Sequence, residues 1–395
     1  RVYWQAQNQP WRIEPEIDTE RQKYLAKRRV IIPNIEKGIY PFKEVKLNRA
    51  DVEWLLATHE NEQGPVNWSD ERQRDRQGLD LRGAYLNDID LQGLPLARLQ
   101  GGIAGNDWTS ALPEQRLMAA VHLERAMLTY AHLEGSILTH AHLQGTKLSG
   151  AHLESVDAFG AHFEGSSPAN LRGAYFDAST KLDQATISND KRIGIRLLDV
   201  HWGNVNLTGL DWPSVRTLYS EHLAQSKIAP DGSIKDRAKR DREYQEAVQA
   251  YRQLSVVLQQ QGLNEDAARF AYRGQNMQRV VLWRQRKVGQ YLFSWFLYLI
   301  AGYGYQPGRS FLAYLLVISG FATAYYFLGH TVGPALSPLG AFVFSMTSFH
   351  GRGFFPGNNI SLDDPLTVLA ALEALVGLII EVTFIATLTQ RFFNR

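Results

Sequence analysis

One group of residues with the types and spacing to do chemistry is a series of histidines, each followed two positions later by a carboxylate or an amide. The histidines are His122, His132, His142, His152 and His162, and the residues that follow them are Glu124, Glu134, Gln144, Glu154 and Glu164. Imidazoles in such a series could bind a metal ion or change charge near neutral pH. A solvated polar face left by duplication of a short repeat is the simpler interpretation, and the sequence favours it.

A second group lies near the C-terminus, where charges are rare. Glu373 and Glu381 are the only charges in the apolar segment 365–390. A carboxylate in an apolar helix is costly unless it faces water or a partner, so we expect Glu381 to line a water-filled cavity. The two glutamates are eight residues apart, which places them about 80° apart around an ideal helix. We therefore expect them to act separately.

Composition limits the remaining possibilities. The chain of 395 residues contains no cysteine, which excludes disulfides, thiolate nucleophiles and cysteine-ligated metals. No nucleophile, metal cluster or phosphate-binding loop stands in a plausible setting, so we expect neither an enzyme nor a resident cofactor. The formal net charge of +2 gives no broad basic field for nucleic acid. At this length we expect two or three structural units.

The histidines belong to a longer pattern whose period is five. Large apolar residues recur every five positions from Leu123 to Phe163, with the small Ala158 as the exception, and a small or β-branched residue stands two positions before each. This period fits neither a helix nor a flat strand, so the chain must turn a corner in every repeat. The pattern resembles the pentapeptide-repeat family, which implies a right-handed quadrilateral β-helix. With four repeats to a coil, alternate histidines would stack about 4.8 Å apart.

The same phase sets the expected boundaries of the repeats. An earlier patch contains Leu81, Leu86, Leu91 and Leu96, and a later one contains Leu171 and Phe176. We expect a solenoid over 79–215, with an insertion near 97–117 that holds one short helix around Pro113. The preceding residues, 1–78, should form a helical capping region. Residues 216–287 have the stripe of apolar positions that predicts a helical hairpin connector, with its first helix ending near Gly262 and Asn264 capping the second.

The C-terminal part carries two segments that could cross a membrane. Residues 310–329 are uncharged, and residues 365–390 are long enough for a second span. Between 288 and 308 the chain is apolar and aromatic but too short to span, which suits a helix at the membrane interface. Basic residues flank the pair of spans outside both ends, which predicts that both termini are cytoplasmic. The apolar stretch GAFVFSMTSF between the spans would then re-enter the membrane.

This order of span, re-entrant helix, glycine-containing turn and span resembles the pore module of the potassium-channel superfamily over residues 309–395. The second span, with Glu373, the mid-helix Gly377 and the exit FIATLTQRFF, is similar to the inner helix of bacterial members with two transmembrane helices. The resemblance implies an α-helical pore shared by four subunits. The expected partners are three further copies of the chain, the lipid bilayer and permeant ions.

The selectivity filter departs from the family pattern F-S-x-x-T-x-T-T-V-G-Y-G-D. The segment aligned with it is FSMTSFHGRGFFP, in which Ser348, Gly353 and Phe354 match the pattern. The expected filter residues are Ser348, Phe349, His350, Gly351, Arg352, Gly353, Phe354 and Phe355. His350 and Gly351 replace the threonines, Arg352 replaces the valine, and Phe355 replaces a glycine whose left-handed turn other residues adopt only at a cost. We therefore expect no strong selectivity for potassium.

Two residues of this filter have alternative interpretations. Arg352 could form a ring of four guanidinium groups at the mouth that favours anions, or it could pair with Glu373 behind the filter. His350 could titrate in the pore or could replace threonine as a hydrogen-bonding group.

The expected function is a tetrameric ion channel in a bacterial plasma membrane, with a cytoplasmic pentapeptide-repeat domain that regulates or assembles it. The alternative is a membrane-anchored scaffold or sensor whose pore does not conduct. The sequence names neither the permeant ion nor a ligand for the repeats.

Overall fold

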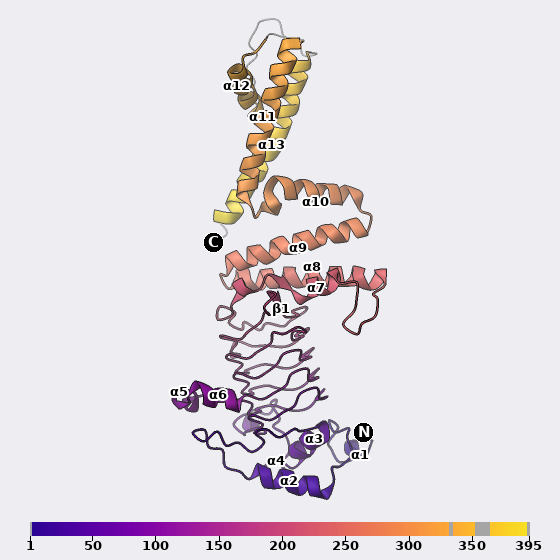
Figure 1. The fold of residues 1–395 in the computed structure, drawn as a ribbon, viewed down its shortest axis with the longest axis vertical. Coiled ribbons are helices and arrows are strands. Elements are labelled where there is room, and N and C mark those ends of the chain that lie inside the picture. The colour runs from indigo at the N-terminus through magenta and orange to yellow at the C-terminus, as the bar shows by residue number, and fades with distance from the viewer. Residues whose placement is uncertain (1, 332–334, 352–363, 393–395) are drawn as a thin grey trace. The chain divides into compact units, whose positions relative to one another are not determined.

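A computed structural model describes residues 2–331, 335–351 and 364–392, and the chain divides into two compact units, Arg1–Phe270 and Ala271–Arg395 (Figure 1). The boundary falls inside helix α9 (Asn264–Arg284), the second helix of the expected hairpin. We describe each unit by itself.

The centre of the first unit is a stack of coils in which parallel bridges join residues twenty positions apart. His122 bridges to His142, and His142 bridges to His162; His132 bridges to His152 in the same way. Four five-residue repeats therefore complete one turn of the chain. Figure 1 shows these coils rising between α6 and β1.

Leucine side chains fill the interior of this stack. Leu123, Leu128 and Leu133 are each at most 1% exposed, and the small residues two positions before them, such as Ala126 and Ala131, are fully buried. Large residues at every fifth position fill the centre of each coil, while the small residues let the backbone turn its corners without steric conflict. The five-residue period is thus a packing rule for the coil.

An insertion leaves the stack after Gln100, which still bridges to Asp80, so it begins later than the expected position 97; the chain then rejoins the stack in phase. Tyr85 bridges to His122, and Gln100 bridges to Ile137, pairs that are 37 residues apart instead of 20, so 17 residues lie outside the coils. The looped segment holds two short helices, α5 (Asn106–Ser110) and α6 (Pro113–Ala119). The helix around Pro113 is present, and the sequence analysis did not predict α5.

Short helices precede the coils. They are α1 (Val2–Ala6), α2 (Thr19–Arg29), α3 (Arg49–Ala57), α4 (His59–Glu62) and the 3₁₀ helix η1 (Glu71–Gln73). Glu53 on α3 is fully buried and connects two parts of this region. Its carboxylate accepts hydrogen bonds from the backbone of Ile13 and Glu14, and it pairs with Arg49 at 2.7 Å.

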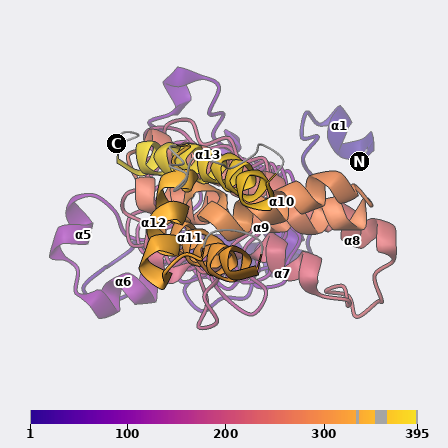
Figure 2. The ribbon, with the colours of Figure 1, turned by 90° about the horizontal axis from the view of Figure 1, so that it is seen from above.

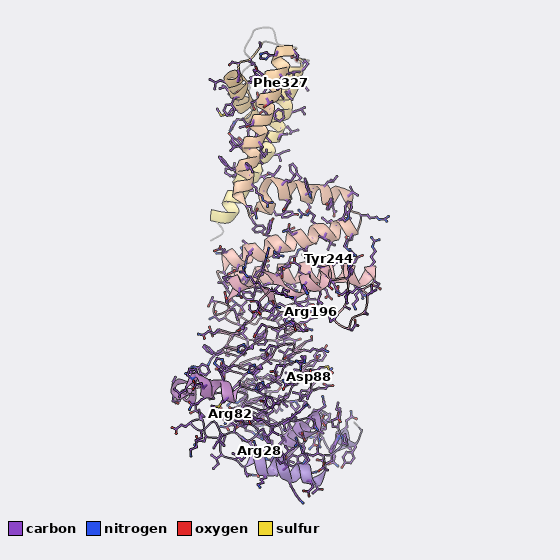
Figure 3. The ribbon with its side chains drawn as sticks, viewed as in Figure 1. Arg28, Arg82, Asp88, Arg196, Tyr244 and Phe327 are labelled. Carbon is purple, nitrogen blue, oxygen red and sulfur yellow. The ribbon has the colours of Figure 1, made fainter. Side chains whose placement is uncertain are left out.

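Two helices follow the last coils. A 3₁₀ helix η2 (Trp212–Ser214) and the short parallel strands β1 (Ile193–Gly194) and β2 (Thr217–Leu218) lead into α7 (Tyr219–Gln225) and α8 (Arg237–Gln260). The expected apolar stripe of α8 is buried, including Tyr244 (Figure 3). Glu246 on α8 accepts from Arg196 of the coils at 2.8 Å, which holds the helix against them.

The second unit consists of helices. After α9 come α10 (Val288–Ala301), a one-turn 3₁₀ helix η3 (Gly302–Gly304), α11 (Pro307–Thr331), α12 (Pro338–Phe349) and α13 (Pro365–Phe392). Helices α11, α12 and α13 contact one another in pairs, and Figure 2 shows them grouped in the view from above.

Two of these helices are long and apolar enough to cross a membrane. The segments are Gly308–Thr331 and Pro365–Ala386. Many of their large apolar side chains are exposed, for example Phe327 at 65% (Figure 3). Leu292, Phe293 and Trp295 on α10 are also exposed. Exposed apolar surface of this extent is typical of contact with lipid or with further subunits.

Candidate functional site

The short helix α12 is the element that positions the candidate site. It begins where Ser337 accepts a hydrogen bond from the backbone N–H of Gly340 at 3.0 Å, and Pro338 occupies its first position. It ends at His350, followed by Gly351 in the left-handed region with φ of 66°. A glycine takes this conformation at little cost, so the sequence ends the helix within the first half of the expected filter.

Fully buried Glu373 connects α13 with both neighbouring helices. Tyr325 of α11 donates its hydroxyl hydrogen to Glu373 Oε2 over 2.7 Å. On α12, the Ser345 hydroxyl lies 2.5 Å from Glu373 Oε1 and 2.9 Å from the carbonyl oxygen of Ile318. Both carboxyl oxygens of Glu373 therefore have partners.

The hydrogens at this site can be counted. A serine hydroxyl has one hydrogen and the carbonyl of Ile318 has none, so an ionised Glu373 would leave one of the two Ser345 contacts without a hydrogen. A protonated Glu373 satisfies every contact: it donates to Ser345, and Ser345 donates to Ile318. The geometry thus fits a neutral carboxylic acid at this buried position, where a charge would be costly.

His350 and Glu381 form a separate pair at the C-terminal end of α12. The Nδ1 atom of His350 lies 2.8 Å from the carbonyl oxygen of Met346, and its Nε2 atom lies 3.3 Å from Glu381 Oε1. Both side chains are partly exposed. A carbonyl can only accept, so Nδ1 must carry a hydrogen; the contact with Glu381 is an ion pair when Nε2 is protonated as well.

The two glutamates have different contacts: Glu373 contacts Tyr325 and Ser345, and Glu381 contacts His350. This arrangement agrees with their expected angular separation on the helix.

Gly377 allows α12 and α13 to approach closely. A Cβ atom at this position would lie 2.1 Å from the backbone carbonyl oxygen of Phe349. Phe349 is buried with Ile318 and Ile380 in a small apolar cluster of all three helices. Gly377, the mid-helix glycine that supported the family resemblance, therefore permits α13 to pack against the C-terminal end of α12.

The structure describes only the first half of the expected filter. Ser348 is buried. Arg352, Gly353, Phe354 and Phe355 lie outside the described residues, and so does any pairing of Arg352 with Glu373.

Tyr325 and Ser345 are site residues that sequence reasoning did not identify. Ser345 was part of the aligned filter segment but had no assigned role. Tyr325 stands 48 residues before Glu373 in a span that contains other hydroxyl-bearing residues, among them Tyr314 and Tyr326, so its hydroxyl alone did not single it out. A partner so distant along the chain becomes visible only when the helices pack.

Cations and aromatic rings gather where α10 meets α11. The guanidinium groups of Arg279 and Arg309 lie 4.2 and 4.6 Å from the centre of the Tyr298 ring. Arg309 also donates to the carbonyl oxygen of Tyr298 at 3.2 Å. Between α10 and α11 the chain bends at the one-turn helix η3, where Tyr303 takes a left-handed conformation.

The histidines of the repeats stack as their ten-residue recurrence predicts. One stack contains His122, His142 and His162, with ring centres 4.5 and 5.5 Å apart; in the other, His132 and His152 are 4.8 Å apart. A hydrogen bond to Glu134 raises the pKa of His132. Burial is the main cause that lowers the pKa of His142, and repulsion from the neighbouring His122 lowers it further.

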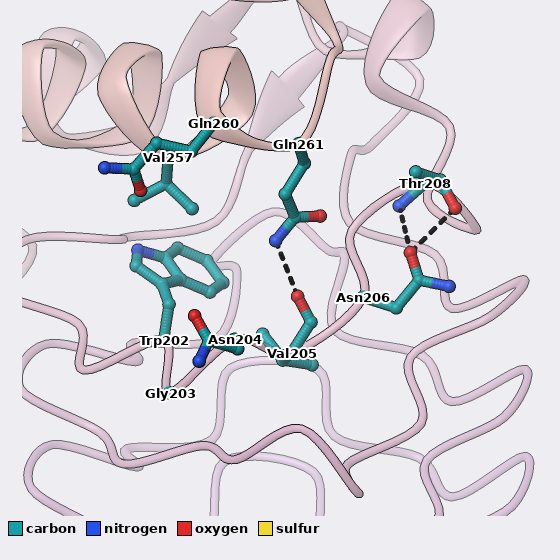
Figure 4. A pocket seen from close by; sticks show the side chains of 9 residues that line it. All are labelled: Trp202, Gly203, Asn204, Val205, Asn206, Thr208, Val257, Gln260 and Gln261. Atoms are coloured by element: carbon teal, nitrogen blue, oxygen red, sulfur yellow. Dashed lines mark hydrogen bonds between the residues drawn. The ribbon is translucent and has the colours of Figure 1, made fainter.

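A pocket of about 580 Å³ lies between the last coils and the end of α8 (Figure 4). Gln261 spans it, donating to the carbonyl oxygen of Val205 at 2.7 Å and accepting from the backbone of Leu207 at 2.8 Å. The other lining side chains include Trp202 and Asn204 but no charged group. The pocket lies where the end of α8 packs on the coils.

Comparison with known proteins bears on the repeats. Residues 118–154 match the model of the family described as pentapeptide repeats, in eight copies. No curated protein matches the chain.

Two pentapeptide repeat proteins of known structure are similar to parts of the chain. One, from the thylakoid lumen of Arabidopsis thaliana, is 24% identical, with 29% of this chain and 79% of that chain covered and a TM-score of 0.16. The other is HetL from the cyanobacterium Nostoc sp. strain PCC 7120, described as involved in heterocyst differentiation regulation. It is 16% identical, with 48% of this chain and all of that chain covered and a TM-score of 0.10. The family match and the bridges twenty residues apart together show that this chain contains pentapeptide repeats.

Proposed function

We propose that the chain is a subunit of a tetrameric ion channel whose pore is built from α11, α12 and α13. The observation that carries the proposal is buried Glu373, which joins a short apolar helix to two helices of membrane-spanning length. A short helix held between two spans by a buried polar network is the arrangement that a re-entrant pore helix requires, because polar groups inside a membrane need internal partners. The resemblance to the potassium-channel superfamily supports the same assignment.

Fourfold assembly follows from what one chain lacks. Two spans and one short helix cannot enclose a pore, whereas closed cyclic symmetry supplies the missing walls. Apolar side chains remain exposed along α13, for example Val368, Leu372 and Leu375, each more than half exposed. Neighbouring subunits and lipid would cover this surface in the assembly.

The proposed pore does not select strongly for potassium. The filter of the superfamily replaces the ion's hydration shell with backbone carbonyl oxygens, and here His350, Gly351, Arg352 and Phe355 stand in place of residues of that pattern. Four copies of the His350–Glu381 pair would place partly exposed charges beside the filter, where the charge of lining residues determines which ions enter.

The remaining parts of the chain have supporting roles in this proposal. The repeats form a right-handed quadrilateral β-helix that assembles or regulates the channel, and they bind no nucleic acid. The protein lies in a bacterial plasma membrane, with both termini in the cytoplasm.

The test is ion flux through purified protein reconstituted in liposomes, with potassium, sodium and chloride compared. We expect a tetramer that conducts with less than about tenfold preference for potassium over sodium. The variant Arg352→Ala separates the two roles of the arginine: a loss of anion preference indicates a pore-facing ring, whereas loss of the tetramer indicates a partner of Glu373. Arg72→Ala in the N-terminal region is the matched control, because the Arg72 side chain is 90% exposed and belongs to the first unit.

Strong potassium selectivity in the wild type would contradict this account of the filter. A stable tetramer that passes none of the three ions would support the second candidate function, a membrane-anchored scaffold or sensor. The observation that favours this candidate is Phe355 at the position of a glycine that the filter turn needs.

A further inference from the structure

One outer face of the stacked coils brings together imidazole and carboxylate groups that the proposed channel function does not use. His132 and His152 stack with their ring centres 4.8 Å apart and their planes 4° from parallel. Glu134 lies beside them, and ligand atoms of these three residues are all within 4.8 Å of one another. The three residues come from adjacent coils, so the repeat spacing itself sets their separation.

The carboxylates lie on the Nδ1 side of both rings. His132 Nδ1 lies 2.9 Å from Glu134 Oε1, and His152 Nδ1 lies 3.1 Å from Glu154 Oε1. An ionised carboxylate can only accept, so Nδ1 carries the hydrogen in both rings when no cation is bound. A cation bound at Nδ1 displaces this hydrogen, and because Glu134 lies on the same side of the His132 ring, one ion can contact both groups.

Glu134 has an oxygen that the protein leaves without a partner. Its side chain is 8% exposed, and Oε2 is buried with no hydrogen-bond partner among the described residues. A buried carboxylate oxygen without a partner is costly. A bound cation would supply the missing partner.

The candidate metal-binding group of the neighbouring stack lacks such an oxygen, although Glu164, which pairs with His162 further along that stack, has one. The candidate group there is His122, Glu124 and His142, but both oxygens of Glu124 are engaged: Oε1 faces His122 Nδ1 at 3.1 Å, and Oε2 accepts from Asn87. The residue two positions after His142 is Gln144, whose amide does not bring a negative charge. The two stacks have the same spacing but offer a cation different ligands.

We propose that His132, Glu134 and His152 form a binding site for a divalent transition-metal ion of the zinc type. Two imidazoles and one carboxylate suit zinc, whereas calcium and magnesium prefer sites made of oxygen alone. Two nitrogens bound to one tetrahedral zinc ion are about 3.3 Å apart, given bonds of about 2.0 Å. The stacked rings must therefore tilt towards each other, which half-exposed His132 has the room to do. The inference does not depend on the proposed channel function.

The experiment is a zinc titration of the full chain in detergent, without an affinity tag, against a chromophoric zinc chelator. We expect one tight equivalent of Zn²⁺ per chain in the wild type. Glu134→Gln and His132→Gln should each weaken this binding at least about tenfold, the lower end of the range found when a metal-binding residue or its support is removed. Glu124→Gln is the matched control and should change the affinity less than about twofold.

A second measurement uses Co²⁺ in place of Zn²⁺. The chain has no cysteine, so visible absorption by bound Co²⁺ must arise from nitrogen and oxygen ligands. We expect these bands in the wild type and in Glu124→Gln and their loss in Glu134→Gln, with unchanged far-ultraviolet circular dichroism in all three. Absence of a stoichiometric zinc site in the wild type would overturn the proposal. So would equal affinity of Glu134→Gln and wild type, or an equal loss in Glu124→Gln.

Discussion

At the scale of single residues, Glu373 illustrates how a carboxyl group is accommodated within an apolar helix. Its two oxygens meet the hydroxyls of Tyr325 and Ser345, and Ser345 in turn meets the carbonyl oxygen of Ile318. Each group in this chain of contacts can donate or accept so that none is left without a partner. The network therefore joins α11, α12 and α13, and its loss should lower the stability of the second unit.

The first prediction removes one donor from this network. Tyr325→Phe keeps the ring, which packs edge-on against Phe344 at 4.7 Å, but deletes the hydroxyl that faces Glu373. A buried acceptor without its donor costs about 1–3 kcal/mol, so the thermal unfolding midpoint in detergent should fall. Tyr326→Phe, which changes the next residue of the same helix, is the control. Equal midpoints for the two variants would show that the hydrogen bond contributes nothing to stability.

At the scale of elements, the contact between α12 and α13 depends on the absence of a side chain at Gly377. Gly377→Ala would place a Cβ atom 2.1 Å from the carbonyl oxygen of Phe349, so the helices must separate. Overpacking of this kind costs about 1–3 kcal/mol, and it would displace the end of α12 that leads into the filter. We expect both a lower unfolding midpoint and a reduced ion flux.

Gly320→Ala is the matched control for this prediction. Gly320 lies on α11, and an added Cβ would meet nothing within 4 Å. The substitution also raises helix propensity, so stability should be unchanged or slightly higher. If Gly377→Ala and Gly320→Ala behave alike, the close approach of α12 and α13 does not matter to the protein.

Elements whose apolar residues recur at a regular spacing could be predicted from the sequence, whereas the side-chain contacts between elements distant in the sequence could not. The five-residue period predicted the stacking of coils, and with it the 4.8 Å distance between His132 and His152. The geometry of a repeat can be predicted from its sequence period because each unit contacts the same positions of its neighbours. Tyr325 and Ser345 escaped prediction because their role arises from the packing of helices distant in sequence. The lack of a hydrogen-bond partner for Glu134 Oε2 also arises from tertiary packing and could not be predicted from the sequence.

At the scale of the whole molecule, the chain joins a repeat stack to a group of apolar helices, and the two units stabilise themselves by different means. In the coils each turn rests on the next, so stability accumulates from contacts between neighbours. In the second unit the described helices leave much apolar surface exposed, which in the proposed channel is covered by lipid and further subunits. Substitutions in the proposed metal site and in the proposed pore should therefore have independent effects.

The last prediction concerns the orientation of the chain in the membrane. Arg279 and Arg309 gather on Tyr298 just before α11, and Arg391 and Arg395 follow the second apolar segment in the sequence. Basic residues near spans remain on the cytoplasmic side, and tyrosines favour the membrane interface. Both ends of the pair of spans should thus face the cytoplasm, with the connection between them outside.

Reporter fusions test this orientation directly. A reporter after Arg395 should be active as a cytoplasmic protein, and one inserted within the segment GNNIS between the spans should be active as an exported protein. The two reporters exchange sides if the topology is inverted, which would contradict the charge rule but preserve two spans. If both report the same side, one of the segments Gly308–Thr331 and Pro365–Ala386 does not cross the membrane. That result would remove the basis for a pore, because a channel of this kind needs both walls in every subunit.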